Sequence, residues 1–85
     1  MPRIVSMDND GSQQEILLVT FEEVTETFRK RVIQWLKTQY SELVRLVRWR
    51  DGKHCNTLMV EIMRSELAFA LVAIKAAIHR RALFK

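Results

Sequence analysis

The sequence predicts a small α+β fold, in which an antiparallel sheet carries two helices. Residues 43–63 hold two β-rich runs around an Asp51-Gly52 turn, and the second run has apolar residues at every second position. Residues 3–21 hold a similar pair of short apolar runs. A segment with apolar residues at helical spacing follows each pair. We therefore expect the element order ββα-ββα.

Two hairpins account for the predicted sheet. Residues 3–7 and 15–21 pair across a polar, turn-forming segment. In the central hairpin, a loop over residues 51–54 places Arg50 opposite Cys55, and a two-residue Asp-Gly turn is the alternative. The first register gives the sheet an apolar side and a polar side. The apolar side holds Leu43, Val47, Trp49, Leu58, Val60 and Ile62, and the other side holds Val44, Leu46, Arg48, Arg50, Thr57, Met59 and Glu61.

The first helix is predicted from a capping signal and from its apolar spacing. Thr20 with Glu23 fits a capping box, so the helix is expected to begin near Phe21. Its apolar residues then recur every three or four positions as far as Tyr40, which defines one helical face.

The last helix, expected over residues 66–83 with Ser65 as its N-cap, is apolar on nearly every side. One other helix and a small sheet offer too little cover for all of these side chains. We therefore expect a homodimer with this helix in the interface. The expected contacts are Leu67, Leu71, Ile74 and Ile78.

An offset of 41 residues aligns the two halves of the chain. The alignment predicts an internal repeat, 3–40 and 45–83, within a single domain that spans residues 1–85. It matches Leu17-Leu18-Val19 with Leu58-Met59-Val60, and it matches Arg3-Ile4-Val5 with Arg45-Leu46-Val47 at an offset of 42.

The alternative fold is an all-α helical hairpin that bends at Asp51-Gly52. The apolar face of the first helix continues tolerably well into residues 43–47. The β-branched content, the Asp-Gly turn and the internal capping signals favour the α+β fold.

The composition favours an ordered, soluble protein of the cytoplasm. Apolar residues make up 48% of the chain, and glycine and proline together number three. The single cysteine, Cys55, suits a reducing compartment. The N-terminal residues lack the pattern of a signal peptide, and the most apolar run, residues 67–78, is too short to cross a membrane.

Charge is divided unevenly along the chain. Residues 1–27 hold one basic and six acidic residues, whereas residues 28–85 hold thirteen basic and four acidic ones. The basic part of the chain suits a polyanion. Arginines of the central hairpin would contact phosphates while an exposed Trp49 stacks on a base. The predicted nucleic-acid contacts are Arg45, Arg48, Trp49, Arg50 and Lys53, together with Arg80 and Arg81.

A different interpretation of the same residues places Trp49 in the core and leaves the arginines as a solvated strand face. The functional expectation is therefore a non-enzymatic binding module, with nucleic acid as its ligand. The alternative is a homo-oligomeric protein-interaction or structural module.

No set of residues indicates an enzyme. His54 and Cys55 are adjacent, so on a strand they point to opposite sides, and a metal site needs three or four ligands. The acids Glu22, Glu23 and Glu26 fit the ordinary acidic start of a helix. We expect no catalytic residue, no metal and no cofactor.

Overall fold

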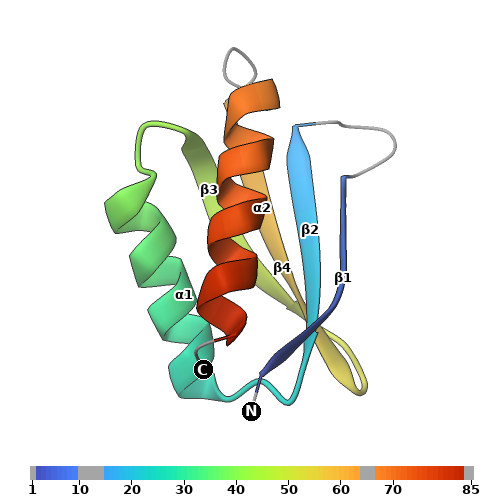
Figure 1. Cartoon of the computed structure of the whole chain (residues 1–85). Coiled ribbons are helices and arrows are strands. Elements are labelled where there is room, and N and C mark those ends of the chain that lie inside the picture. The colour runs from blue at the N-terminus through green and yellow to red at the C-terminus, as the bar shows by residue number, and fades with distance from the viewer. Residues whose placement is uncertain (1, 10–14, 64–66, 84–85) are drawn as a thin grey trace.

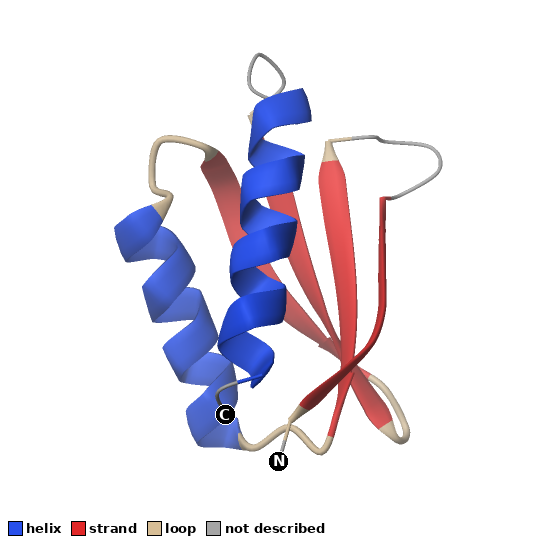
Figure 2. Cartoon of the chain, viewed as in Figure 1, coloured by secondary structure: helices blue, strands red, loops and turns tan. Residues whose placement is uncertain are grey.

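The computed structural model describes residues 2–9, 15–63 and 67–83, and it shows a small α+β fold. The four strands form one antiparallel sheet in the order β1-β2-β4-β3, and both helices lie on the same face of it (Figures 1 and 2). The predicted class is confirmed, and the all-α alternative is wrong. The elements are β1 (Arg3–Asn9), β2 (Ile16–Glu22), α1 (Glu26–Gln39), β3 (Val44–Asp51), β4 (Cys55–Ile62) and α2 (Leu67–Leu83).

The core lies between the sheet and the two helices. The apolar residues that alternate along the central strands point toward the helices and are at most 1% exposed. Helix α1 packs over β3, and α2 packs over β1 and β4. Each helix contributes one stripe of apolar side chains. The core includes Leu17, Val19 and Phe21 of β2, Leu58, Val60 and Ile62 of β4, Phe28, Val32 and Leu36 of α1, and Ala70, Ile74 and Ile78 of α2.

Helix α1 begins later than the sequence predicted. Thr20 and Phe21 belong to β2, and the N-cap is Thr25, whose hydroxyl oxygen accepts a hydrogen bond from the Phe28 amide at 3.1 Å. The alternation of β2 continues through Phe21, whose buried ring lies 5.4 Å from the Phe28 ring. The predicted cap is wrong because burial of an aromatic ring stabilises more than a capping hydrogen bond. The predicted cap of the last helix, Ser65, lies outside the described residues.

The central hairpin pairs two positions away from the predicted register. Strand β3 ends at Asp51 and β4 begins at Cys55, so Arg50 lies opposite Thr57. Because side chains alternate with a period of two, this shift keeps the residues from Leu46 onward on their predicted sides. A Cβ atom at Gly52 would lie 2.5 Å from the carbonyl oxygen of Cys55, so this turn requires glycine.

Each edge strand carries one β-bulge, which the sequence analysis did not foresee. The pairing skips Val5 in β1 and Arg45 in β3. The second bulge explains two departures from regular alternation. Val44 packs against the core instead of facing the opposite side, and Arg45 reaches Glu61 instead of the apolar layer.

The strand pairing is compatible with the predicted internal repeat, which stays a prediction. The pairing of β2 with β4 is symmetric under the predicted repeat. When 41 is added to a β2 residue number and subtracted from that of its β4 partner, the result is again a pair of this ladder, as with Ile16–Glu61 and Thr20–Thr57. The first residues of the two helices, Glu26 and Leu67, are also 41 positions apart. The edge strands fit less well. Their bulges, at Val5 and Arg45, are 40 positions apart, whereas the alignment of these two strands in sequence uses an offset of 42.

Candidate interaction surface on the uncovered face of the sheet

The sheet face opposite the helices carries side chains that no described helix or strand covers. Paired residues on neighbouring strands point to the same side, so the register arranges these side chains in rows across the sheet. From β1 to β3, the rows are Asp8–Leu18–Met59–Arg48 and Ser6–Thr20–Thr57–Arg50, followed by the shorter row Ile16–Glu61–Leu46.

The centre of this face is apolar. Ile16, Leu18 and Met59 are half-buried between their neighbours, and Leu46 is 48% exposed. An antiparallel sheet with helices on one face usually presents polar residues to water on the other. Here Leu18 and Met59 are neighbours at the centre, and Glu61 lies between Ile16 and Leu46 in the next row. Apolar side chains in this position are typical of a surface that binds a partner.

The two edges of the uncovered face carry opposite charges. Asp8 is exposed on β1, and Arg48 and Arg50 are exposed on β3. Within the part of the chain that the structure describes, no ion pair involves any of these three residues. Their charges are therefore available to a binding partner.

Two groups of ion pairs neutralise the other charges of this face. Arg3 donates from Nε to Glu22 at 2.7 Å, and this hydrogen bond raises the pKa of Arg3. Arg45 lies 3.4 Å from Glu61 and 3.8 Å from Glu15. Because water screens exposed pairs of this kind, they contribute little to stability, and their main effect is on the charge pattern.

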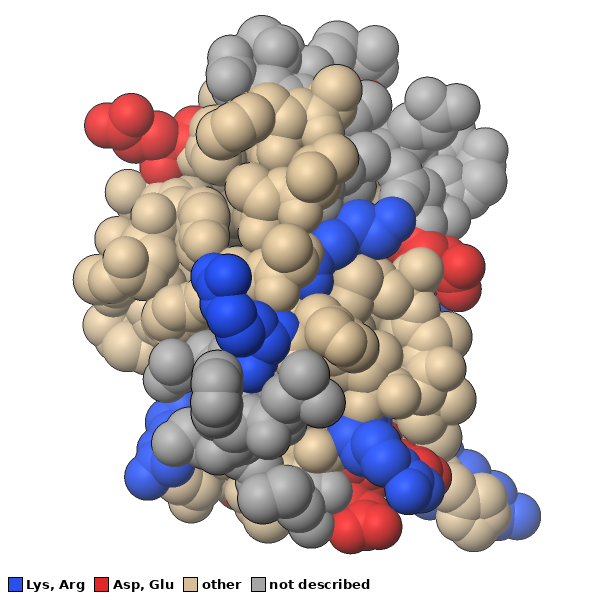
Figure 3. Space-filling model, in the orientation of Figure 1, with Lys and Arg blue, Asp and Glu red and all other residues tan. Residues whose placement is uncertain are grey.

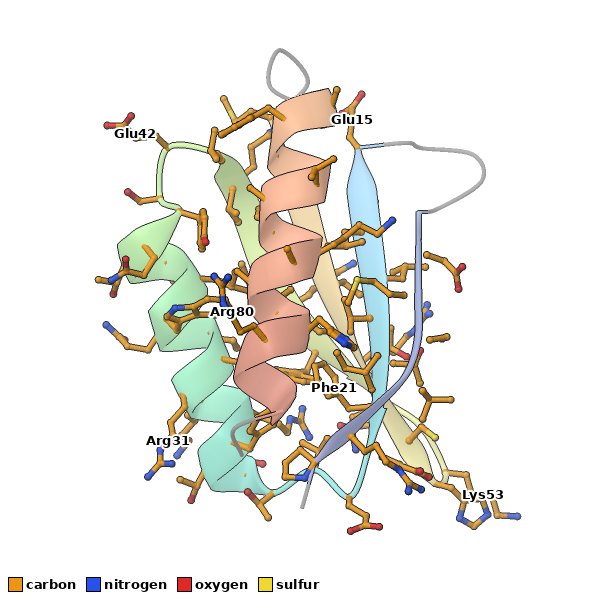
Figure 4. The ribbon with its side chains drawn as sticks, viewed as in Figure 1. Glu15, Phe21, Arg31, Glu42, Lys53 and Arg80 are labelled. Carbon is orange, nitrogen blue, oxygen red and sulfur yellow. The ribbon has the colours of Figure 1, made fainter. Side chains whose placement is uncertain are left out.

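The predicted nucleic-acid contacts do not form one continuous surface. Three arginines of β3 share the uncovered face, one lysine lies at the tip of the β3–β4 turn and points into solvent, and one arginine is exposed on α2, on the opposite side (Figure 4). These are Arg45, Arg48 and Arg50, then Lys53, then Arg80; the side chain of Arg81 lies outside the described part of the chain.

Trp49 lies on the helix side of the sheet, away from the arginines beside it in sequence. Its indole nitrogen donates to the Arg29 carbonyl oxygen at 3.1 Å, and its ring lies 5.6 Å from the ring of Phe21 and 6.4 Å from that of Phe28. The Arg29 guanidinium lies 5.7 Å from the indole centroid and pairs with Asp51 at 2.7 Å. The tryptophan therefore packs α1 against the central hairpin and also joins them by a hydrogen bond.

Two of the four predicted interface residues of α2 are buried within the chain. Ile74 and Ile78 are 0% and 3% exposed, so they belong to the chain's own core. Among the described side chains of this helix, the large apolar ones that are exposed are Phe69 and Val72. Figure 3 shows that the surface over the upper half of α2 is largely uncharged. A contact through α2 would use these two residues. The side chains of Leu67 and Leu71 lie outside the described part of the chain.

The residues considered for catalysis are distributed over the β3–β4 turn, the two central strands and the start of α1. His54 is exposed in the turn, whereas Cys55 is in β4, paired with Glu22. Glu26 alone of the three candidate acids is in the first turn of α1. Among residues 2–9, 15–63 and 67–83, no three potential metal-ligating side chains come together.

The uncovered face was not predicted as a site from the sequence, although one signal for it was present. Residues 16–21 are apolar at every position except Thr20, so both faces of this strand carry apolar side chains. Such a run is typical of a strand that is covered on both sides. Asp8 was assigned to a turn, but β1 extends to Asn9 and includes it.

Comparisons with protein families, with curated proteins and with solved structures found no match for the chain. Within the described ranges 2–9, 15–63 and 67–83, neither helix combines the length and the hydropathy needed to cross a membrane. The fold and its surface define a small α+β protein with an open-faced sheet, and its function has to be inferred from that surface.

Proposed function

We propose that the protein is a non-enzymatic protein-interaction module and that its binding surface is the uncovered face of the sheet. The observation that carries this proposal is the apolar centre formed by Leu18, Met59, Ile16 and Leu46 on a face that the helices leave open. Flat apolar sheet faces pack well against another sheet or an apolar protein surface. The charged edges add directional specificity to such a contact.

Nucleic acid is the second candidate ligand, because Arg48 and Arg50 are exposed on one face without a carboxylate partner among the described residues. Sheets that bind single strands usually stack bases on aromatic side chains. The aromatic residues of the described strands, Phe21 and Trp49, face the helices instead. A protein partner is therefore favoured.

A salt titration with labelled single- and double-stranded oligonucleotides tests the second candidate. Binding through the β3 arginines would fall steeply with rising salt, and it would be lost in the Arg48→Glu, Arg50→Glu double variant. The absence of binding at low salt would eliminate nucleic acid as a ligand of this face.

The proposed module is tested by replacing Met59, which lies at the apolar centre. Sedimentation velocity at increasing concentration is expected to show self-association of the wild type and a monomer for Met59→Glu. A charge buried in the middle of an interface weakens association by about 30-fold or more. The fold is expected to remain, because Met59 points away from the helices.

The matched control is Val72→Glu, which places the same charge on the exposed side of α2. This variant is expected to associate like the wild type. A monomeric Val72→Glu with an unaffected Met59→Glu would contradict the proposal.

A further inference from the structure

We infer that the uncovered face binds a second copy of the chain, in a symmetric dimer whose two-fold axis runs parallel to the strands. This inference rests on the proposed interaction surface and specifies its partner. It follows from the sign and the position of the charges at the two edges of the sheet.

The row through the centre of the face defines the pairing. Asp8 stands at its β1 end and Arg48 at its β3 end, with Leu18 and Met59 between them. A two-fold axis parallel to the strands, between β2 and β4, places β1 of one copy over β3 of the other. It leaves positions along the strands unchanged, so Asp8 comes to lie opposite the partner's Arg48, and the contact occurs twice.

The same operation stacks the apolar centres of the two copies. Leu18 of one copy lies over the partner's Met59, and the reciprocal contact forms on the other side of the axis. Stacked sheets lie about 10 Å apart, with strands crossing at about 30°, a spacing that side chains of this size fill. The result is an apolar contact at the centre, with opposite charges at both edges. In the next row, Glu61 of each copy lies over the partner's Ile16, where its carboxylate keeps the ion pair with Arg45.

The charges also disfavour a second face-to-face arrangement. A two-fold axis in the same plane but perpendicular to the strands would place β3 over β3 and β1 over β1. Arg48 and Arg50 would then lie near the same arginines of the partner, with like charges juxtaposed at the rim. Juxtaposed like charges disfavour an interface, so the parallel axis is preferred.

The area of the face indicates a weak dimer. Four strands of about seven residues give a face of roughly 19 by 23 Å, which is on the order of 500 Å² per copy. A standard interface buries about 800 Å² per partner. The dissociation constant is therefore expected in the micromolar range, where removal or reversal of one charge pair is readily measured.

Charge reversal tests the pairing. Asp8→Arg and Arg48→Asp, each alone, are expected to raise the dissociation constant at least about tenfold in low-salt sedimentation equilibrium, because each puts like charges opposite each other twice. The Asp8→Arg, Arg48→Asp double variant restores opposite charges. Its dissociation constant is expected within about threefold of the wild-type value.

Two exposed residues away from the face supply matched controls. Glu42→Arg makes the same change of net charge as Asp8→Arg, and Lys30→Asp makes the same change as Arg48→Asp. Both controls are expected to dimerise like the wild type. Equal weakening in the controls would attribute the effect to net charge and would overturn the pairing.

The remaining outcomes separate the pairing from the proposed function. If Met59→Glu dissociates the assembly but the double charge reversal does not restore it, the face binds in another arrangement and only the pairing is wrong. If Met59→Glu associates normally, the interaction surface itself is wrong. A wild type that stays monomeric at every concentration refutes the dimer.

Discussion

Replacement of Ile74 by aspartate is expected to unfold the protein. Ile74 is fully buried on the inner side of α2, among apolar side chains of the sheet and of α1. An unpaired carboxylate in such a place costs on the order of 4–5 kcal/mol or more. Small domains have a total stability of about 5 kcal/mol at the lower end of the usual range. Circular dichroism at room temperature is expected to show the loss of the helices.

The control for this experiment is Val72→Asp, two positions away on the same helix. Val72 is 72% exposed, so its replacement is expected to change the free energy of unfolding by no more than about 0.5 kcal/mol. A folded Ile74→Asp variant with altered assembly would contradict the structure and support the interface that the sequence alone predicted.

Replacement of Trp49 by alanine is expected to lower the free energy of unfolding by about 3–5 kcal/mol. The indole fills the space between α1 and β3, contacts Phe21 and Phe28, and donates a hydrogen bond to the Arg29 carbonyl. Trp49→Phe keeps an aromatic ring but loses the donor, so about 1 kcal/mol of the loss is expected from the hydrogen bond. Urea denaturation of the three proteins measures both values.

Arg48→Ala is the matched control on the same strand, because Arg48 points to the opposite side of the sheet. It is expected to alter stability by at most about 0.5 kcal/mol. If Trp49→Ala instead left stability unchanged and abolished oligonucleotide binding, the tryptophan would be a base-stacking residue.

The α+β class and the order of the elements could be predicted because the apolar periodicity changes clearly between two and 3.6 residues. From Leu46 onward, the strand alternation also predicted the two sides of the central hairpin, although the register was wrong by two positions. It placed Trp49 on the same side as Leu58 and Arg48 on the same side as Met59. The nucleic-acid hypothesis grouped Trp49 with its sequence neighbours, although adjacent residues of a strand face opposite sides. Adjacency in sequence was misleading there.

Three features could not be predicted from local patterns. The start of α1 depends on the burial of Phe21, which requires both Phe28 and Trp49 to be in place. The bulge at Arg45 depends on how β3 aligns with β4, and a strand's own sequence does not specify this alignment. The opposite charges of Asp8 and Arg48 become one pattern only when the order β1-β2-β4-β3 is known.

The bulges of the two edge strands bear on how large any assembly can become. An open sheet has two free edges, and strands added there in succession would build an endless fibre. A bulge interrupts the row of unpaired backbone groups that such growth needs, and here it occurs on both edges, at Val5 and at Arg45. Association across the face ends once two copies have met. The edge bulges therefore disfavour polymerisation, and the pair proposed above would be a closed assembly.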